Sequence, residues 1–275
     1  MKKIALLVLL MLLSIVFVAC DTTSTTPNRE QIIVGMEAAY APFNWTVSES
    51  NASESAVRLY GSNNYVDGYD VEVARLIAQA LDMDLVIKAV DWDGLIPSLV
   101  TSQEIDLIIA GMSPTAQRAQ TVAFTDEYYQ STHVIVLRND SIYLNANSIN
   151  DFSMANVVCQ AQTIYDDLAT QLIGANHANP LPDVPTIITA INQGTYDITI
   201  LELPVAIAIT QTNPLLTFIE FDEGLGFDVT YEDSAVSIAL RLGEESLLAQ
   251  INQILSEISL ETREELMNQA ITRQQ

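Results

Sequence analysis

Short apolar runs alternate with amphipathic stretches along this chain, and the alternation starts again in the second half. Apolar runs as long as strands lie at residues 31–36, 85–90, 106–110, 132–137, 156–160, 197–201, 218–221 and 234–240. Apolar residues at helical spacing predict helices at 71–82, 93–102, 164–173, 187–193, 204–212 and 244–269, and one near Pro114. Polar residues 46–66 are interpreted as a hairpin or surface insertion. The alternation favours an α/β fold with mostly parallel sheets flanked by helices.

The first twenty residues carry the features of an export signal. Two lysines are followed by an apolar run over 4–18, and small residues precede Cys20. This ending is similar to a lipoprotein signal, so we predict a signal peptide at 1–19 and a lipid on Cys20. Residues 20–30, which are mostly polar and rich in threonine, are interpreted as a flexible tether. The alternative is an uncut membrane anchor, although the apolar run is short for a span of about 20 residues.

The chain is strongly acidic, with 35 Asp and Glu residues against 11 Lys and Arg residues. Because phosphate binding needs a basic surface, we expect no nucleic-acid partner. Hydrophobic residues make up 49% of the 275 residues, which is enough for a packed core in one large domain or two ordinary ones. The cysteines are Cys20 and Cys159. If Cys20 carries lipid, no internal disulfide can form, and Cys159 is interpreted as a small buried apolar residue.

A carboxylate site is predicted where the apolar run 106–110 ends. Ser113 suits a helix N-cap, and Pro114 suits the first helical position. Free backbone N–H groups at a helix start attract anions. Arg118, one turn further on, can offer a bidentate fork to a carboxylate. The alternative is an ordinary capped helix with a surface arginine.

Two further helix starts could face the same ligand. Thr163 and Asp166 fit a capping box in which Asp stands in place of Glu. Glu202 ends the apolar run 197–201 and precedes Pro204. Ligands of α/β sheets usually lie at strand ends, so Glu202 could pair with an ammonium group. The alternatives are plain capping at Thr163 and a solvated loop residue at Glu202.

Aromatic residues stand at two other strand exits. Tyr40 and Phe43 flank Pro42, and Trp92 lies between two aspartates. Such side chains can stack on a ligand, although they can equally cover the core. Glu37 follows the first strand and could add a negative charge to a pocket.

Taken together, these segments resemble the polar amino-acid solute-binding proteins of ABC transporters, the extracellular or periplasmic family 3. The resemblance runs from residue 33 to about residue 271. It rests on the number, order and spacing of the segments 34–43, 68–72, 91–97, 106–118, 124–129 and 201–205. It implies a type II periplasmic-binding-protein fold of two α/β lobes joined by two hinge strands. Lobe 1 would comprise 31–137 and 230–275, lobe 2 would comprise 138–229, and lobe closure would bury the ligand.

The resemblance also implies how the ligand's amino-acid head would bind. Arg118 would clamp the α-carboxylate, assisted by the backbone N–H groups of Ser113 and Thr163. The Gly111 carbonyl, the Ser113 hydroxyl and Glu202 would receive the α-ammonium group. The family usually has Asp at the place of Glu202, so the ammonium group could sit differently here.

Tyr40 and Trp92 would sandwich the ligand's side chain in the same resemblance. Glu37 stands where family members that bind cationic amino acids carry an acid. A further departure lies before Thr163, where Ala161 and Gln162 occupy a turn in which the family has glycine. The Thr163 contact is therefore less firmly implied than the Arg118 contact.

The sequence thus predicts a lipid-anchored receptor outside the cytoplasm that captures a polar L-amino acid for an ABC permease. Lysine or arginine is favoured because Glu37 would meet a distal cation, and glutamine comes next. We expect a monomer without cofactor or metal. One alternative is a dehydratase-type enzyme, disfavoured because His133 and His177 lie outside the matching motifs. Another is an amino-acid-sensing or adhesive surface protein on the same fold.

Overall fold

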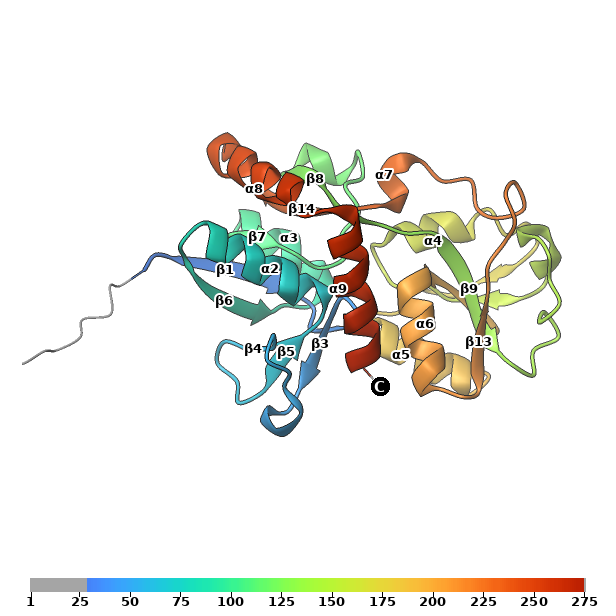
Figure 1. The fold of residues 1–275 in the computed structure, drawn as a ribbon. Helices are drawn as coiled ribbons and strands as arrows, with labels where there is room; N and C mark the ends of the chain where they lie inside the picture. The colour runs from blue at the N-terminus through green and yellow to red at the C-terminus, as the bar shows by residue number, and fades with distance from the viewer. Residues whose placement is uncertain (1–28, 275) are drawn as a thin grey trace, which may run out of the picture.

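The computed structural model describes residues 29–274, so the predicted signal peptide and Cys20 lie outside the described residues. Two five-stranded sheets form the centres of two lobes that lie side by side (Figure 1). The first half of the chain builds most of one lobe, and the middle of the chain builds the other. The alternation seen in the sequence is therefore expressed as two separate α/β units.

The first sheet has the strand order β6-β1-β7-β14-β8. Its strands are β1 (Gln31–Met36), β6 (Asp84–Ala89), β7 (Leu107–Ile108), β8 (Val122–Gln130) and β14 (Ala235–Arg241). β1 is parallel to β6 and β7, whereas β14 is antiparallel to both β7 and β8. β14 alone therefore runs against the other strands, which agrees with the predicted mostly parallel sheet.

The second sheet repeats this plan, with the order β11-β10-β12-β9-β13. Its strands are β9 (His133–Arg138), β10 (Asn156–Val157), β11 (Asn176–His177), β12 (Ile198–Glu202) and β13 (Leu216–Ile219). β10 is parallel to β11 and β12, and β9 is antiparallel to β12 and β13. The run predicted as a strand over 156–160 forms pairs in β10 only at its first two residues.

A small antiparallel sheet includes the segment 46–66 predicted as a hairpin or surface insertion, and it begins earlier, at residue 39. It consists of β2 (Ala39–Tyr40), β3 (Asn44–Val47), β5 (Tyr65–Asp67) and β4 (Val57–Arg58), with the 3-10 turn η1 (Glu49–Asn51) between β3 and β4. A bridge between Leu59 and Ile87 attaches the segment to β6. The insertion is thus part of the first lobe and brings Tyr40 to its edge.

The helices of the first lobe are α2 (Tyr69–Ala80), α3 (Leu95–Val100), α8 (Glu245–Glu257) and α9 (Leu260–Arg273), with the 3-10 turn η2 (Trp92–Gly94) before α3. The prediction of one helix over 244–269 is wrong. The chain leaves the helical conformation at Ile258, and the Ser259 hydroxyl caps a new helix by accepting from the Thr262 N–H at 3.1 Å. α9 packs on α2 and on α6 of the second lobe, so it runs along the junction (Figure 1).

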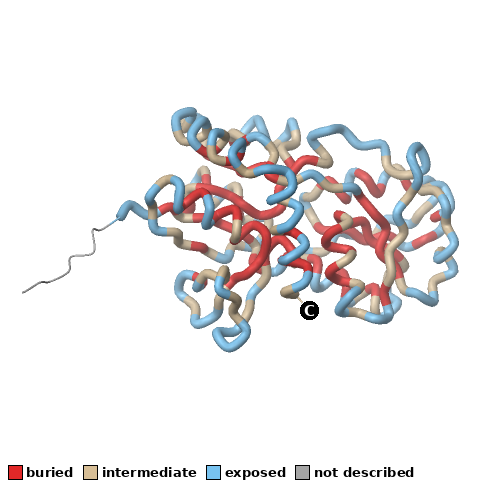
Figure 2. Tube along the Cα trace, viewed as in Figure 1, coloured by how far each residue is buried: buried red, intermediate tan, exposed pale blue. Residues whose placement is uncertain are grey.

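The second lobe carries α4 (Ile164–Ala169), α5 (Val184–Asn192) and α6 (Leu203–Thr212), together with the short turns η4 (Ile149–Phe152) and α7 (Tyr231–Ser234). α4 is shorter than the predicted 164–173. Its apolar residues join a core cluster on one side of the sheet, whereas α5 and α6 join the larger cluster that continues into the first lobe. The buried positions form a continuous interior in both lobes (Figure 2).

The chain crosses between the sheets twice, once between β8 and β9 and once between α7 and β14. The two crossings lie together, because the Ser131 N–H donates to the Ser234 carbonyl at 3.0 Å. Gln130 adds a side-chain hydrogen bond to the Ser234 hydroxyl. β9 belongs to the second sheet, so the change of sheet falls at about residue 131, before the boundary after residue 137 that the sequence led us to expect. Across residues 29–274, no helix has both the length and the apolar character to cross a membrane.

Candidate ligand-binding site

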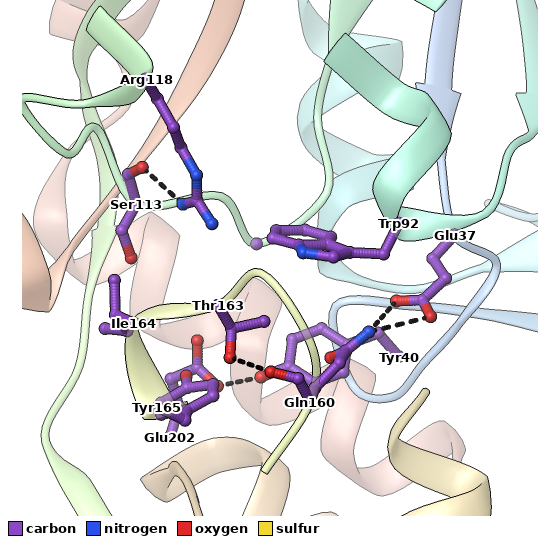
Figure 3. A pocket seen from close by; sticks show the side chains of 11 residues that line it. Glu37, Tyr40, Trp92, Ser113, Arg118, Gln160, Thr163, Ile164, Tyr165 and Glu202 are labelled. Carbon is purple, nitrogen blue, oxygen red and sulfur yellow. Dashed lines mark hydrogen bonds between the residues drawn. The ribbon is translucent and has the colours of Figure 1, made fainter. Parts of the chain in front are cut away.

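A pocket lies between the two sheets. All eight residues that the sequence singled out line it. They are Glu37, Tyr40, Trp92, Gly111, Ser113, Arg118, Thr163 and Glu202 (Figure 3). The pocket is lined by residues of both lobes, and the roles of the eight residues in binding stay predictions.

The segment around Ser113 does not form the helix that its capping signals predicted. After Gly111 the chain stays irregular until a single 3-10 turn, η3 (Arg118–Gln120). The residue before this turn, Gln117, makes no side-chain cap, and the Arg118 N–H instead donates to the Thr115 hydroxyl at 3.3 Å. Because β8 begins at Val122, no more than one helical turn fits. The predicted carboxylate site therefore has no α-helix N-terminus at Ser113.

Arg118 nevertheless points into the pocket (Figure 3). Its guanidinium donates to the carbonyl of Ser113 at 2.8 Å and to that of Gln162 at 3.0 Å, and it lies over the Trp92 ring. Burial lowers the pKa of Arg118 to about 10, so the group is still charged at neutral pH. Among residues 29–274, no carboxylate forms an ion pair with Arg118. A half-buried cation with only carbonyl partners is well placed to receive an anionic group.

Gly111 occupies a position where a side chain would not fit. Its φ is +64°, and an added Cβ would lie 3.1 Å from the ring of Tyr40. The Gly111 N–H donates to the Tyr128 hydroxyl, which in turn donates to Asp70 at 2.6 Å. Asn44 donates to the second Asp70 oxygen at 2.7 Å. This buried chain of hydrogen bonds fixes the backbone at the base of the pocket.

The turn before α4 contains two backbone carbonyls that accept hydrogen bonds from pocket residues. The Thr163 hydroxyl donates to the Gln160 carbonyl at 2.8 Å and caps no helix N–H, so the predicted capping box with Asp166 is wrong. Gln162 has a φ of +59°, the left-handed conformation that favours glycine. Its carbonyl accepts from Arg118 and from the Trp92 ring nitrogen. The turn thus links the second lobe to two pocket residues of the first.

Replacing Gln162 with glycine should stabilise the protein. The left-handed conformation costs an ordinary residue about 1–2 kcal/mol, whereas glycine loses only about 0.5–1 kcal/mol more backbone entropy. We expect the free energy of unfolding to rise by up to about 1 kcal/mol, measured by urea denaturation. Ala161→Gly is the matched control and should lower it, because Ala161 has no positive φ to relieve. A loss of stability in both variants would contradict the prediction.

Glu202 ends β12 as a buried side chain, 4% exposed. The hydroxyl of Tyr40, from the first lobe, donates to one Glu202 oxygen (Figure 3). Tyr165 in α4 makes a second side-chain hydrogen bond to the same carboxylate. Burial raises the pKa of Glu202, and these two hydrogen bonds counteract the rise. The predicted ammonium acceptor therefore sits in the pocket with two tyrosine partners.

Glu37 lies at the opposite end of the pocket from Arg118 (Figure 3). The Gln160 amide reaches it from the second lobe, with Nε2 at 3.2 Å and 3.4 Å from the two carboxylate oxygens. Burial raises the pKa of Glu37 to about 7; Gln160 lowers it, and Asp183 and Asp91 raise it further. In the described part of the chain, Glu37 has no cationic partner that would keep its carboxylate ionised.

Gln160, Ile164 and Tyr165 also line the pocket, although the sequence did not single them out for it. Gln160 lies at the end of a predicted strand, where nothing local points to a partner in the other lobe. Tyr165 follows Thr163 by two residues. A polar aromatic residue in the first turn after a predicted ligand-facing helix start was the available signal. Within residues 29–274, no group of three or more His, Cys, Asp or Glu side chains is arranged to hold a metal ion.

Comparison with known proteins agrees with this architecture. The model of the bacterial extracellular solute-binding proteins, family 3, matches residues 32–272. The arginine-binding extracellular protein ArtP of Bacillus subtilis (strain 168) is 26% identical over 268 residues, covering 94% of this chain and 93% of ArtP. An ancestral arginine-binding protein bound to arginine aligns with a TM-score of 0.70 at 26% identity, covering 88% of this chain and 98% of that one.

An ancestral arginine-binding protein bound to glutamine gives a TM-score of 0.69 at 26% identity, covering 88% of this chain and 97% of that one. These likenesses confirm the type II periplasmic-binding-protein fold of two lobes that the sequence led us to expect. Because the family's model spans almost all of the described chain, the assignment does not rest on isolated motifs. The chain belongs to family 3 of the bacterial extracellular solute-binding proteins.

Proposed function

We propose that this protein captures a cationic L-amino acid, arginine or lysine, in the pocket between its lobes and delivers it to an ABC permease. The observation that carries the proposal is the distribution of charge in the pocket. Arg118 lies at one end, Glu37 lies at the other, and Glu202 is the second acid of the lining. An amino acid with a cationic side chain has an anionic and a cationic group at its head and a second cation at its tail.

The charges of pocket and ligand balance for this class of ligand. The ionised lining carries one cation, Arg118, and two anions, Glu37 and Glu202. Its net charge of about −1 is opposite to that of zwitterionic arginine or lysine, about +1 at neutral pH. Buried charges need partners, so a neutral amino acid would leave Glu37 unpaired or protonated. Glutamine is therefore the second choice.

The head of the ligand would bind at the end of the pocket that holds Arg118. The guanidinium would form a fork with the α-carboxylate, assisted by the backbone N–H groups of Ser113 and Thr163. The α-ammonium group would be received by Glu202, the Ser113 hydroxyl and the Gly111 carbonyl. The support for this arrangement is that all these residues line the same pocket.

The side chain of the ligand would run between Tyr40 and Trp92 towards Glu37. Its cation would replace the Gln160 amide as the partner of the carboxylate. A neighbouring hollow shares Trp92, Arg118 and Thr163 with the pocket and would be the route by which the ligand enters. Its lining includes the carboxylates of Asp93, Asp166, Asp167 and Asp233. An acidic entrance would raise the local concentration of a cationic ligand.

The relatives support both the preferred ligand and the alternative. ArtP is named for binding arginine, and the ancestral proteins were solved with arginine and with glutamine. These proteins bind solutes, which supports a binding protein over an enzyme here. We further propose that the lobes close about the paired crossings near residues 131 and 234, as hinged two-lobed receptors do. The first lobe would comprise the first sheet with α2, α3, α8 and α9.

The proposed receptor acts as a monomer outside the cytoplasm. Its anchor would be a lipid on Cys20 after removal of residues 1–19, and the polar segment 20–30 would tether the lobes to the membrane. Support for the location comes from the family, whose members are extracellular. Support for the lipid comes from the sequence of the signal. Mass spectrometry of the membrane fraction would test it, and an unmodified Cys20 would contradict it.

A thermal-shift screen of the twenty amino acids tests the proposed ligand. A ligand that binds only the folded state raises the melting temperature, because at 100 times Kd it adds about 2.7 kcal/mol to the stability. For a protein of this length, that free energy corresponds to a shift of roughly 5–10 °C. We expect arginine or lysine to give the largest shift, glutamine a smaller one, and aspartate none. A largest shift with an acidic amino acid, or none with any, would refute the proposed function.

A further inference from the structure

Two tyrosine hydroxyls, one from each lobe, converge on the carboxylate of Glu202. Tyr40 lies in the small sheet of the first lobe, whereas Tyr165 lies in the first turn of α4 (Figure 3). Tyr40 donates to one oxygen, and Tyr165 makes the second hydrogen bond. All three side chains are buried, with exposures of 6%, 4% and 4% for Tyr40, Tyr165 and Glu202. The carboxylate therefore cannot exchange these partners for bulk water while the lobes are closed.

The position of Tyr165 is fixed by packing. Its ring meets that of His133 edge-on, with the centroids 5.8 Å apart and the planes at 61°. His133 is the β9 partner of Glu202 in the second sheet. The register of β9 and β12 thus sets the positions of both the Glu202 carboxylate and the His133 ring on which Tyr165 packs. Packing within the second lobe therefore places the ring of Tyr165, and its hydroxyl also hydrogen-bonds with Tyr40 of the first lobe.

An ionised carboxylate can accept about four hydrogen bonds. Two of these places are taken by the tyrosines and a third by the backbone N–H of Glu202 itself, which leaves about one for an incoming donor. Glu202 and both tyrosines belong to the pocket lining, so a ligand in the pocket can approach this carboxylate. An ammonium group needs acceptors of this kind, and its charge needs the carboxylate to be ionised.

We propose that Tyr165 is a positioning residue for the α-ammonium subsite: its hydroxyl orients Glu202 and keeps it ionised, so that the remaining acceptor position of the carboxylate meets the ligand's ammonium group. The inference rests on the proposed function and deepens it. It assigns the recognition of the ammonium group to a set of three side chains from both lobes. Tyr165 contacts Glu202, the residue that would receive the ammonium group, and it affects the ligand only through Glu202.

The electrostatic surroundings of Glu202 show in which direction its pKa should change when the Tyr165 hydroxyl is removed. Burial favours the protonated form, whereas the hydrogen bonds from Tyr165 and Tyr40 favour the ionised form. Asp70 and Tyr129 also interact with Glu202 through their charges. Arg118 interacts with the hydroxyl of Tyr165, and His133, which packs on that ring, has its pKa lowered to about 4 by burial. His133 is therefore neutral over the useful pH range, and removing the Tyr165 hydroxyl should raise the pKa of Glu202.

The test uses ligand pairs that differ only in the α-amino group. L-Arginine is compared with 5-guanidinopentanoate, and L-lysine with 6-aminohexanoate, by titration calorimetry on the unaltered protein and on Tyr165→Phe. The substitution keeps the ring packed on His133 and removes only the hydroxyl. A hydrogen bond to a charged group corresponds to a change in affinity of about 10- to 150-fold. We expect this loss for the amino acids and less than about a threefold change for the analogues.

A pH series separates positioning from a structural role. Since Tyr165→Phe raises the pKa of Glu202, its affinity for the amino acid should begin to fall at a higher pH than that of the unaltered protein. Tyr129→Phe is the matched control, because it removes a nearby tyrosine hydroxyl for which the structure shows a charge interaction with Glu202 and no hydrogen bond. It should change neither the affinity ratio nor the pH profile.

The outcomes distinguish this inference from the proposed function. If Tyr165→Phe weakens amino acid and analogue equally, or weakens neither, the positioning role is overturned while the proposed function stands. If the unaltered protein binds neither arginine nor lysine, the proposed function fails and this inference fails with it. If Tyr165→Phe changes the ratio of the affinities for amino acid and analogue but leaves the pH dependence of amino-acid affinity unchanged, the claim that Tyr165 keeps Glu202 ionised is overturned.

Discussion

Arg118→Ala should severely weaken the binding of every amino acid, whatever its side chain. The guanidinium is the cation of the pocket lining and has no carboxylate partner among the described residues. Removing it would leave the ligand's α-carboxylate buried without a counter-charge. Truncating one partner of such a buried pair costs about 2–5 kcal/mol, which is roughly a 30- to 5,000-fold loss of affinity. Titration calorimetry with arginine, lysine and glutamine measures the loss for all three.

Two further variants define what the Arg118 result means. Arg118→Lys keeps the charge but loses the planar fork, so it should bind more weakly than the unaltered protein and more tightly than Arg118→Ala. Arg75→Ala is the matched control, because Arg75 is exposed and donates to the carbonyl of Glu54 on the surface. It should leave affinity unchanged. Tight binding of any amino acid by Arg118→Ala would refute the proposed carboxylate site.

The general fold could be predicted from the sequence because its strands are short apolar runs. β1 and β12 coincide with predicted runs to within one residue, and each is buried along most of its length. Burial on both faces selects apolar residues at every position, so the run itself marks the strand. β11 is a two-residue strand with exposed residues, so it carries no such signal and was not predicted.

Capping signals were less dependable than apolar runs. Ser113 and Pro114 satisfy the local rules for a helix start, yet the structure forms a single turn that begins later. Helix formation needs several turns to offset the cost of the first, and the start of β8 at Val122 leaves no room for them. Arg118 still lines the pocket despite this error, because a long side chain can reach the pocket from the turn.

Contacts between the lobes could not be predicted from local patterns. Glu37 and Gln160 are 123 residues apart in the chain, and Tyr40 and Glu202 are 162 residues apart. Their meeting depends on how the two sheets are placed against each other, which no single segment encodes. The sequence identified Glu37, Tyr40 and Glu202 as separate candidates, whereas the partners of Glu37 and Glu202 became visible only in the structure.

Glu37→Gln should change the selectivity of the receptor. The amide keeps the size of the side chain but cannot neutralise a cation. A hydrogen bond to a charged group contributes about 1.5–3 kcal/mol, so affinity for arginine and lysine should fall by about 10- to 150-fold. Glutamine carries no distal charge, and its affinity should change by less than about threefold. Calorimetry at pH 8, where Glu37 is mostly ionised in the ligand-free protein, gives the cleanest comparison.

The dependence on pH separates the charge of Glu37 from its shape. Burial raises the pKa of Glu37 to about 7, so the carboxylate is largely protonated at pH 6 and largely ionised at pH 8. Since a bound cation stabilises the ionised form, affinity for arginine should rise as the pH increases through 7. This rise should be smaller in Glu37→Gln. Asp91→Asn is the matched control: it removes a neighbouring negative charge, keeps Glu37, and should lower the pH at which affinity rises. If arginine, lysine and glutamine all lose affinity equally in Glu37→Gln, Glu37 shapes the pocket without selecting the cation.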